Sequence, residues 1–272
     1  MTEQYFQWIS WAWIAIGIIT FIYLFKQTAP YGRHSNERWG PMIDNRWGWF
    51  IMEVFVLVIL AYFLWDAKKQ LNVVSGIMVG LFVFHYFNRS IVFPLRLKTN
   101  GKKMPVIIMV SAMMFNTMNG FFMGYYFGNF ASYTMDWLTD PRFIIGMMVF
   151  FTGMIINWHS DAILINLRKP GETGYKIPRG GLFKWVSCPN LLGEVIEWVG
   201  FGILTWSLPG LVFAIGLLPT WCHELFLTTS GINKSSKNTR RNERPSFRSF
   251  GDFFTSYSLP LGLPYVLTIF HC

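Results

Sequence analysis

Long apolar runs constrain this chain more than any other feature of its sequence. Largely apolar stretches fall at 6–25, 48–65, 73–95, 104–127 and 142–165. Each is close to the roughly 20 residues that an α-helix needs to cross a bilayer, and a helix satisfies its own backbone polar groups inside hydrocarbon. A sixth and a seventh helix are predicted at 191–206 and from 208 onward. We therefore expect an all-α integral membrane protein with seven transmembrane helices.

The composition agrees with a membrane protein and limits its partners. Charged residues make up 14% of the chain, against about 25% in soluble domains. The net charge of +9 is spread over short loops between apolar runs, so we expect a lipid bilayer and no nucleic acid as partner. The three cysteines have no metal-ligand spacing, and no metal site is predicted. The sequence leaves the oligomeric state open, a monomer included.

Basic residues predict the orientation in the membrane. They gather in the loops after the first, third and fifth predicted helices, and such loops face the cytosol. The N-terminus then faces away from the cytosol, in a bacterial inner membrane or the endoplasmic reticulum. The basic residues of these loops are Lys26, Arg33, Arg38, Arg46, Arg96, Lys98, Lys102, Lys103, Arg168, Lys169, Lys176, Arg179 and Lys184.

Ionisable and amide side chains are concentrated between residues 157 and 207 of this apolar chain. Asn157 and Asp161 are four residues apart and share a helix face, and Arg168 follows two turns later. A charged group near hydrocarbon costs about 2 kcal/mol or more unless it is paired or hydrated. A cluster this dense therefore predicts a site for a polar ligand.

The loop and helix that follow add groups suited to a nucleotide. Glycines and prolines between residues 170 and 181 form a tight loop whose backbone can approach a phosphate. Asn190, Glu194 and Glu197 begin the next helix. Carboxylates suit ribose hydroxyls, and basic side chains of the loop suit phosphates. No GxGxxG follows a strand, which excludes a Rossmann site.

Two further polar groups lie inside apolar helices. Glu53 has no basic residue within a helical turn, so it must find a partner in another segment or be protonated. The motif HYFNR places His85, Tyr86 and Arg89 late in the third predicted helix. A phenol beside a protonated carboxyl group can stabilise the negative charge that develops on a ketone oxygen. We therefore expect Glu53 and Tyr86 to act together on a carbonyl group.

These motifs resemble a known family. NWHSDAILINLRKPGETGYKIPRGGLF followed by NLLGEVIEWVGFGILTWSLP closely resembles the signature of the steroid 5α-reductases. FIMEVF, FHYFNR, NGFFMGYYF and WLTDPRF match the family in order and approximate spacing. The resemblance runs from about residue 45 to residue 215.

The resemblance implies a seven-helix membrane enzyme with a cofactor pocket that faces the cytosol. Such an enzyme uses NADPH to reduce the 4,5 double bond of a 3-oxo-4-ene steroid. It adds hydride at C5, stabilises the enolate at the C3 oxygen and protonates C4. By motif position, Glu53 and Tyr86 would be catalytic and hold the C3 oxygen. The cofactor-binding positions would be Arg89, Asn157, Asp161, Arg168, Tyr175, Asn190 and Glu194.

The C-terminal tail departs from the family pattern. The family continues after SLP with a basic, aromatic tail rich in histidine and tyrosine, whereas this chain reads GLLPTWCHELFLTTSGINKSSKNTRRNERPSFRSFGDFF. With suitable synonymous codons, a shifted reading frame from Pro219 encodes that family tail and then a stop codon. We therefore predict a membrane domain at 1–215 and an out-of-frame tail at 216–272.

Other functions remain open at this point. A membrane reductase of another lipid double bond, in a polyprenol or an enoyl thioester, would also need NADPH and an apolar cavity. A methyltransferase of the isoprenylcysteine type would instead bind S-adenosylmethionine in a related membrane pocket. A non-catalytic lipid-binding or scaffold protein would use the polar groups only to pack its helices.

Overall fold

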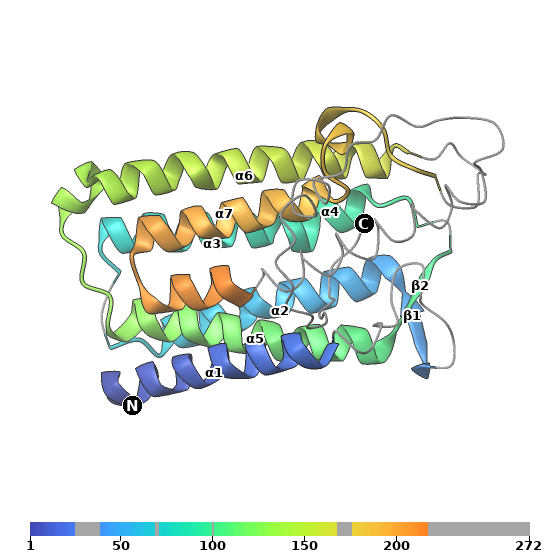
Figure 1. Cartoon of the computed structure of the whole chain (residues 1–272). Helices are drawn as coiled ribbons and strands as arrows, with labels where there is room; N and C mark the ends of the chain where they lie inside the picture. The colour runs from blue at the N-terminus through green and yellow to red at the C-terminus, as the bar shows by residue number, and fades with distance from the viewer. Residues whose placement is uncertain (25–38, 69–70, 100, 168–175, 217–272) are drawn as a thin grey trace, which may run out of the picture.

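The computed structural model describes residues 1–24, 39–68, 71–99, 101–167 and 176–216. Each apolar range expected to be helical contains a helix, and the helices lie side by side along one common direction (Figure 1). Residues 208–216 are also helical, up to the end of the described chain. The helices are α1 (Glu3–Leu24), α2 (Asn45–Trp65), α3 (Val73–Phe87), α4 (Phe93–Arg96), α5 (Val106–Asn129), α6 (Pro141–Ile165) and α7 (Pro189–Thr205), with short turns η3 (Asn88–Val92), η4 (Met135–Thr139) and η5 (Gly181–Lys184).

Four segments of the described chain are long and apolar enough to cross a membrane. These candidate spans are Asn45–Trp65, Val73–Arg96, Val106–Asn129 and Pro141–Ile165. The remaining helices include α7, which has 17 residues. The structure therefore supports an all-α membrane protein, while the number of seven spans stays a prediction.

A short pair of strands was not expected from the sequence. β1 (Met42–Asp44) and β2 (Lys103–Pro105) pair antiparallel, with Met42 opposite Pro105. Both strands lead directly into helices, β1 into α2 and β2 into α5, and these two helices pack against each other. The segments that precede α2 and α5 therefore meet, and their backbone N–H and C=O groups form hydrogen bonds with each other.

Described parts of the three basic loops meet at this end of the helix bundle. The Arg46 Nη2 donates to the Leu97 carbonyl oxygen at 2.8 Å, and the Lys98 Nζ donates to Asn166 Oδ1 at 2.8 Å. The β1–β2 pair brings Lys103 opposite Asp44. These described parts of the loops therefore lie at one end of the molecule. The assignment of that end to the cytosol stays a prediction.

Glycines let helices approach each other closely at two interfaces. Gly146 and Gly153 of α6 face Gly200 and Gly193 of α7, and a Cβ atom at any of them would lie within 2.5 Å of a backbone atom of the other helix. A similar row on α5, with a glycine every fourth residue, packs on α2. Small residues at helix interfaces allow such close packing in membranes. The α6–α7 contact sets the position of the polar side chains on both helices.

Together α3, η3 and α4 form one continuous helical segment, Val73–Arg96, which we call the α3–α4 rod. It stays helical through Pro94 because η3, its π turn, is a π-helix. In an α-helix the ring of Pro94 would clash with the carbonyl of Ser90. The η3 turn is wider, and the backbone N–H of Phe93 bonds to the carbonyl oxygen of Asn88, five residues earlier. The Ser90 hydroxyl donates to the Tyr86 carbonyl oxygen at 2.6 Å. Such turns are frequent at functional sites.

At the end of the helix bundle away from β1 and β2, polar side chains hold the last turn of α7 (Figure 1). The Tyr133 hydroxyl donates to the Thr205 carbonyl oxygen at 2.6 Å, and the Trp137 Nε1 donates to the Leu204 carbonyl oxygen at 2.9 Å. Burial raises the pKa of the Tyr133 phenol, so this group remains a donor. These bonds satisfy carbonyl groups that have no partner at a helix end.

Candidate active site

Ionisable side chains from three separate parts of the sequence line one pocket. Glu53 comes from α2, Tyr86 from α3, Arg89 from the π turn and Glu194 from α7, and each is at most 6% exposed. The cavity between these side chains has a volume of about 20 Å³. Among the described residues, its lining consists of Glu53, His85, Tyr86, Arg89, Phe115, Asn116, Glu194, Trp198 and Phe213.

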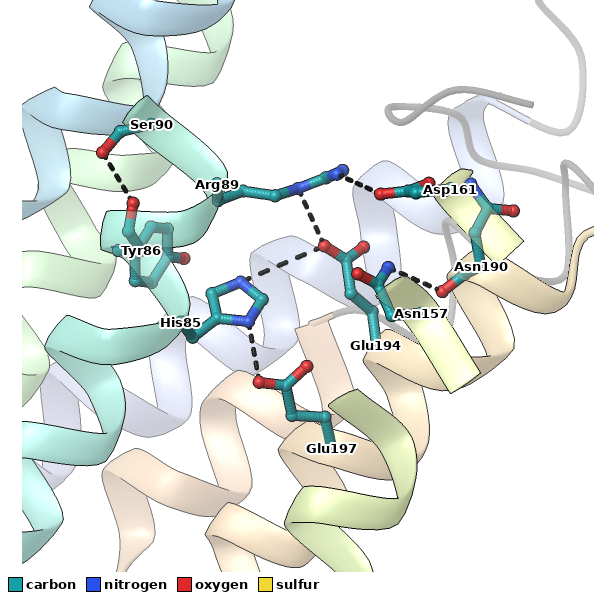
Figure 2. A network of polar contacts seen from close by, with 9 residues as sticks. All are labelled: His85, Tyr86, Arg89, Ser90, Asn157, Asp161, Asn190, Glu194 and Glu197. Atoms are coloured by element: carbon teal, nitrogen blue, oxygen red, sulfur yellow. Dashed lines mark hydrogen bonds and ion pairs between the residues drawn. The ribbon is translucent and has the colours of Figure 1, made fainter. Parts of the chain in front are cut away.

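Arg89 is the cation at the centre of this polar network (Figure 2). Its Nε lies 3.1 Å from Glu194 Oε1, and its Nη1 lies 3.3 Å from Asp161 Oδ2. The guanidinium carbon lies 4.8 Å from the ring centres of both Trp49 and Phe93. Two carboxylates and two aromatic faces thus hold the buried charge in one position.

An amide side chain joins α6 to the first turn of α7. The Asn157 Nδ2 donates to the Asn190 carbonyl oxygen at 3.0 Å. This bond depends on the glycine contact, because a Cβ atom on Gly193 would lie 2.5 Å from the backbone nitrogen of Asn157. The Asn190 side chain lies beside Asp161. The predicted pair at 157 and 161 therefore meets the predicted start of the next helix.

The polar groups that interact with Glu53 come from other helices, because α2 has no basic residue within a helical turn of it. It is 2% exposed, and Arg89 from η3 lies near enough to interact with it electrostatically. Asn116 of α5 lies beside its carboxyl group and donates from Nδ2 to the Met52 carbonyl oxygen at 2.6 Å. The Tyr86 ring packs on Phe82, with ring centres 4.8 Å apart. The carboxyl group and the phenol therefore reach the same pocket from different helices.

The structure adds two residues that are not among the predicted catalytic and cofactor-binding positions. His85 Nδ1 lies 2.8 Å from Glu197 Oε1, and His85 Nε2 lies 4.0 Å from Glu194 Oε1. Both residues are buried, with Glu197 at 0% exposure. The available signal was position: His85 precedes Tyr86, and Glu197 follows Glu194 by one helical turn.

The predicted site residues divide into two groups. Arg168 and Tyr175 lie outside the described residues. The other predicted residues lie in or beside one network of buried polar groups: Glu53, Tyr86, Arg89, Asn157, Asp161, Asn190 and Glu194.

The polar groups in and around this network include types that can hold a phosphorylated dinucleotide. The carboxylates of Asp161 and Glu194 offer acceptors for ribose hydroxyls. Arg96 lies near enough to Asp161 to interact with it electrostatically, and the exposed Arg179 and Lys184 follow in and beside η5. Such cations attract phosphate groups. The described site thus has acidic groups in the interior and basic groups at the surface.

Comparison with known proteins identifies similar chains. A family model described as 3-oxo-5-alpha-steroid 4-dehydrogenase matches residues 102–249. The chain is 40% identical over 223 residues to 3-oxo-5-alpha-steroid 4-dehydrogenase 1 of Rattus norvegicus, covering 78% of this chain and 86% of the relative. It is 40% identical over 202 residues to the Homo sapiens protein of that name, covering 74% and 78% of the two chains. It is also 40% identical over 203 residues to the steroid 5-alpha-reductase DET2 of Gossypium hirsutum, covering 73% and 78%.

Proposed function

Because the chain belongs to the 3-oxo-5-alpha-steroid 4-dehydrogenase family of oxidoreductases, we propose that it reduces the 4,5 double bond of a 3-oxo-4-ene steroid with NADPH. One observation carries the proposal: Glu53 and Tyr86, from different helices, line one pocket together with apolar side chains. That pocket combines a surface for a lipid with two groups for a carbonyl oxygen.

The chain's own residues have distinct tasks in this proposal. The Tyr86 hydroxyl donates a hydrogen bond to the C3 oxygen of the steroid, and Glu53 lies beside it. Negative charge grows on that oxygen as the double bond accepts hydride at C5, and a donor aimed at growing charge lowers the barrier. The enolate then takes up a proton at C4.

NADPH would lie against the second part of the network. We assign Arg89, Asp161 and Glu194 to the buried part of the cofactor, with Asn157 and Asn190 beside them. When bound, NADPH supplies the hydride. In this proposal, the end of the molecule that carries β1, β2 and the basic loops faces the cytosol, where NADPH is available. Arg168 and Tyr175 remain proposed cofactor contacts on the strength of the family motif.

Turnover assays with purified protein in lipid nanodiscs test the proposal. NADPH oxidation is followed with a panel of 3-oxo-4-ene steroids, and separately with enoyl thioesters and a polyprenol. We expect turnover with the steroids and a loss of about 100- to 1,000-fold in kcat for Tyr86→Phe, as for removal of one oxyanion donor. Tyr62→Phe is the matched control, because Tyr62 is 61% exposed on α2.

Three results would contradict the proposal. Turnover confined to thioesters or polyprenols would assign another substrate class. Thermal protection by S-adenosylmethionine and not by NADPH would indicate a methyltransferase. Full activity of Tyr86→Phe would remove this residue from the mechanism.

A further inference from the structure

His85 and Glu197 form a buried pair that the proposed mechanism does not yet use. His85 is 5% exposed and lines the same pocket as Glu53 and Tyr86. We propose that His85, oriented by Glu197, is the acid that delivers the proton taken up at C4 of the substrate. This inference rests on the proposed function and assigns the proton donor that the reduction requires.

Hydrogen bonding determines which ring nitrogen of His85 is available. An ionised carboxylate only accepts hydrogen bonds, so the 2.8 Å contact with Glu197 Oε1 keeps a hydrogen on Nδ1. Nε2 is then the nitrogen left for proton exchange, and at 4.0 Å from Glu194 it is beyond direct hydrogen-bond distance. Edge contacts with Trp198 and Tyr86, with ring centres 4.7 and 5.0 Å apart, hold the ring in this orientation.

The charges around the ring favour its protonated form. Asp161 and Glu194 already share the cation of Arg89 through ion pairs. Glu197 has no ion pair with Arg89 in the described part of the chain, and its Oε2 has no hydrogen-bond partner there. A fully buried carboxylate requires a countercharge. An imidazolium at His85 supplies it and also stores a proton at the pocket wall.

The proton balance of the reduction then closes within the pocket. Hydride addition at C5 moves the electron pair of the double bond toward the C3 oxygen, where the Tyr86 hydroxyl donates a hydrogen bond. As the enolate returns to the ketone, the Nε2–H bond of His85 breaks and a C4–H bond forms. The ring becomes neutral, its Nδ1–H still donates to Glu197, and Nε2 takes a new proton from water. Tyr86 keeps its own proton throughout.

Two substitutions at His85 distinguish the roles of its two ring nitrogens. The amide of His85→Asn can still donate to Glu197 in place of Nδ1, but it carries no transferable proton. We expect its kcat to fall about 100-fold or more, the usual range for loss of a general acid. The KM for the steroid and the Kd for NADPH should change less than about threefold. His85→Gln places its amide nearer the position of Nε2 and should lose the Glu197 contact, the fixed orientation and kcat together.

Glu197 is tested as a positioning residue by a spectroscopic signature. The protein is labelled with nitrogen-15 at its five histidines, and the His85 signals are assigned by their absence in His85→Asn. In the wild type at high pH, neutral His85 should carry its hydrogen on Nδ1. Glu197→Gln should keep this tautomer, because the amide oxygen still accepts, whereas Glu197→Ala should lose it together with most of kcat.

The outcomes distinguish the two proposals. A wild-type protein inactive with every 3-oxo-4-ene steroid would overturn both. An active wild type with an equally active His85→Asn would overturn only the role of His85. A loss of kcat matched by an equal loss of NADPH affinity, or a wild-type hydrogen on Nε2, would also overturn that role.

Discussion

Replacing Gly153 by alanine should move the active site without touching any of its side chains. The added Cβ atom would lie 2.2 Å from the backbone nitrogen of Glu197 and 2.5 Å from the carbonyl oxygen of Gly193. Ordinary van der Waals contact begins at 3.4 Å, so the α6 and α7 backbones must separate locally by about 1.2 Å, the difference between 3.4 and 2.2 Å. Both neighbours are backbone atoms, and no side-chain rotation relieves the overlap.

Two effects of different size follow from this separation. Overpacking of this kind destabilises a protein by about 1–3 kcal/mol. The Asn157–Asn190 bond, now 3.0 Å, would lengthen to about 4 Å, beyond hydrogen-bond distance. Misplacement of catalytic groups by about 1 Å lowers rates by about 100-fold. We therefore expect Gly153→Ala to retain its fold with a lowered Tm and to lose about 100-fold in kcat.

The assay measures thermal unfolding in nanodiscs, steroid turnover and NADPH affinity for three variants. Gly80→Ala is the matched control in a helix, because a Cβ atom there meets nothing within 4 Å. Gly146→Ala overlaps the backbone nitrogen of Leu204 at 2.4 Å, at the α6–α7 interface two turns from Gly153. It should lower Tm as much as Gly153→Ala and kcat less. A Gly153→Ala protein with the Tm and kcat of Gly80→Ala would refute the reasoning.

Three further predictions concern stability. Arg89→Met leaves Asp161 and Glu194 buried without their shared cation. We expect the free energy of unfolding, measured with denaturant, to fall by about 3–5 kcal/mol. Adding Asp161→Asn and Glu194→Gln to this variant should restore most of the loss, and an unchanged unfolding midpoint for Arg89→Met would contradict the prediction. Tyr133→Phe leaves the Thr205 carbonyl oxygen without its 2.6 Å donor and should lower the free energy of unfolding by about 1–3 kcal/mol, while a loss no larger than that of the exposed Tyr62→Phe would show that the bond is dispensable. Hydrogen bonds from the Arg142 side chain and backbone lower the pKa of Asp140 from 3.8 to about 2; the ionised form therefore stabilises the fold above about pH 4, and this contribution is lost as the pH falls through about 2. Asp140→Asn keeps the N-cap but not the charge, so its Tm should lie below that of the wild type near neutral pH and equal it below pH 2, and a Tm difference independent of pH would argue against the ion pair.

Helix positions could be predicted well because a bilayer requires apolar stretches of a given length. The predicted range 48–65 corresponds to Asn45–Trp65, and the predicted range 142–165 corresponds to Pro141–Ile165. The β1–β2 pair escaped prediction because three-residue strands have no usable periodicity, and their pairing depends on how α2 and α5 pack. The sequence also does not reveal which glycines face each other, because that requires the relative rotation of two helices.

The candidate site could be predicted residue by residue but not as a set of contacts. Buried charges in apolar helices mark Glu53 and Asp161 individually, since such groups are rare there unless functional. The pairing of His85 with Glu197 joins residues 112 positions apart, and no local spacing predicts it. Nor does the sequence predict the π turn, because Pro94 is equally compatible with a helix that simply ends before it.

Because of the π turn, the active site depends on the number of residues in the α3–α4 rod. Deleting one residue between Asn88 and Val92 would restore an α-helical turn, in which the proline ring would clash with the carbonyl group four residues earlier. The helix would then kink or end before the proline, and Phe93 would lose its position 4.8 Å from the guanidinium carbon of Arg89. A homologous chain can thus keep every polar residue of this site and still lose it by being one residue too short.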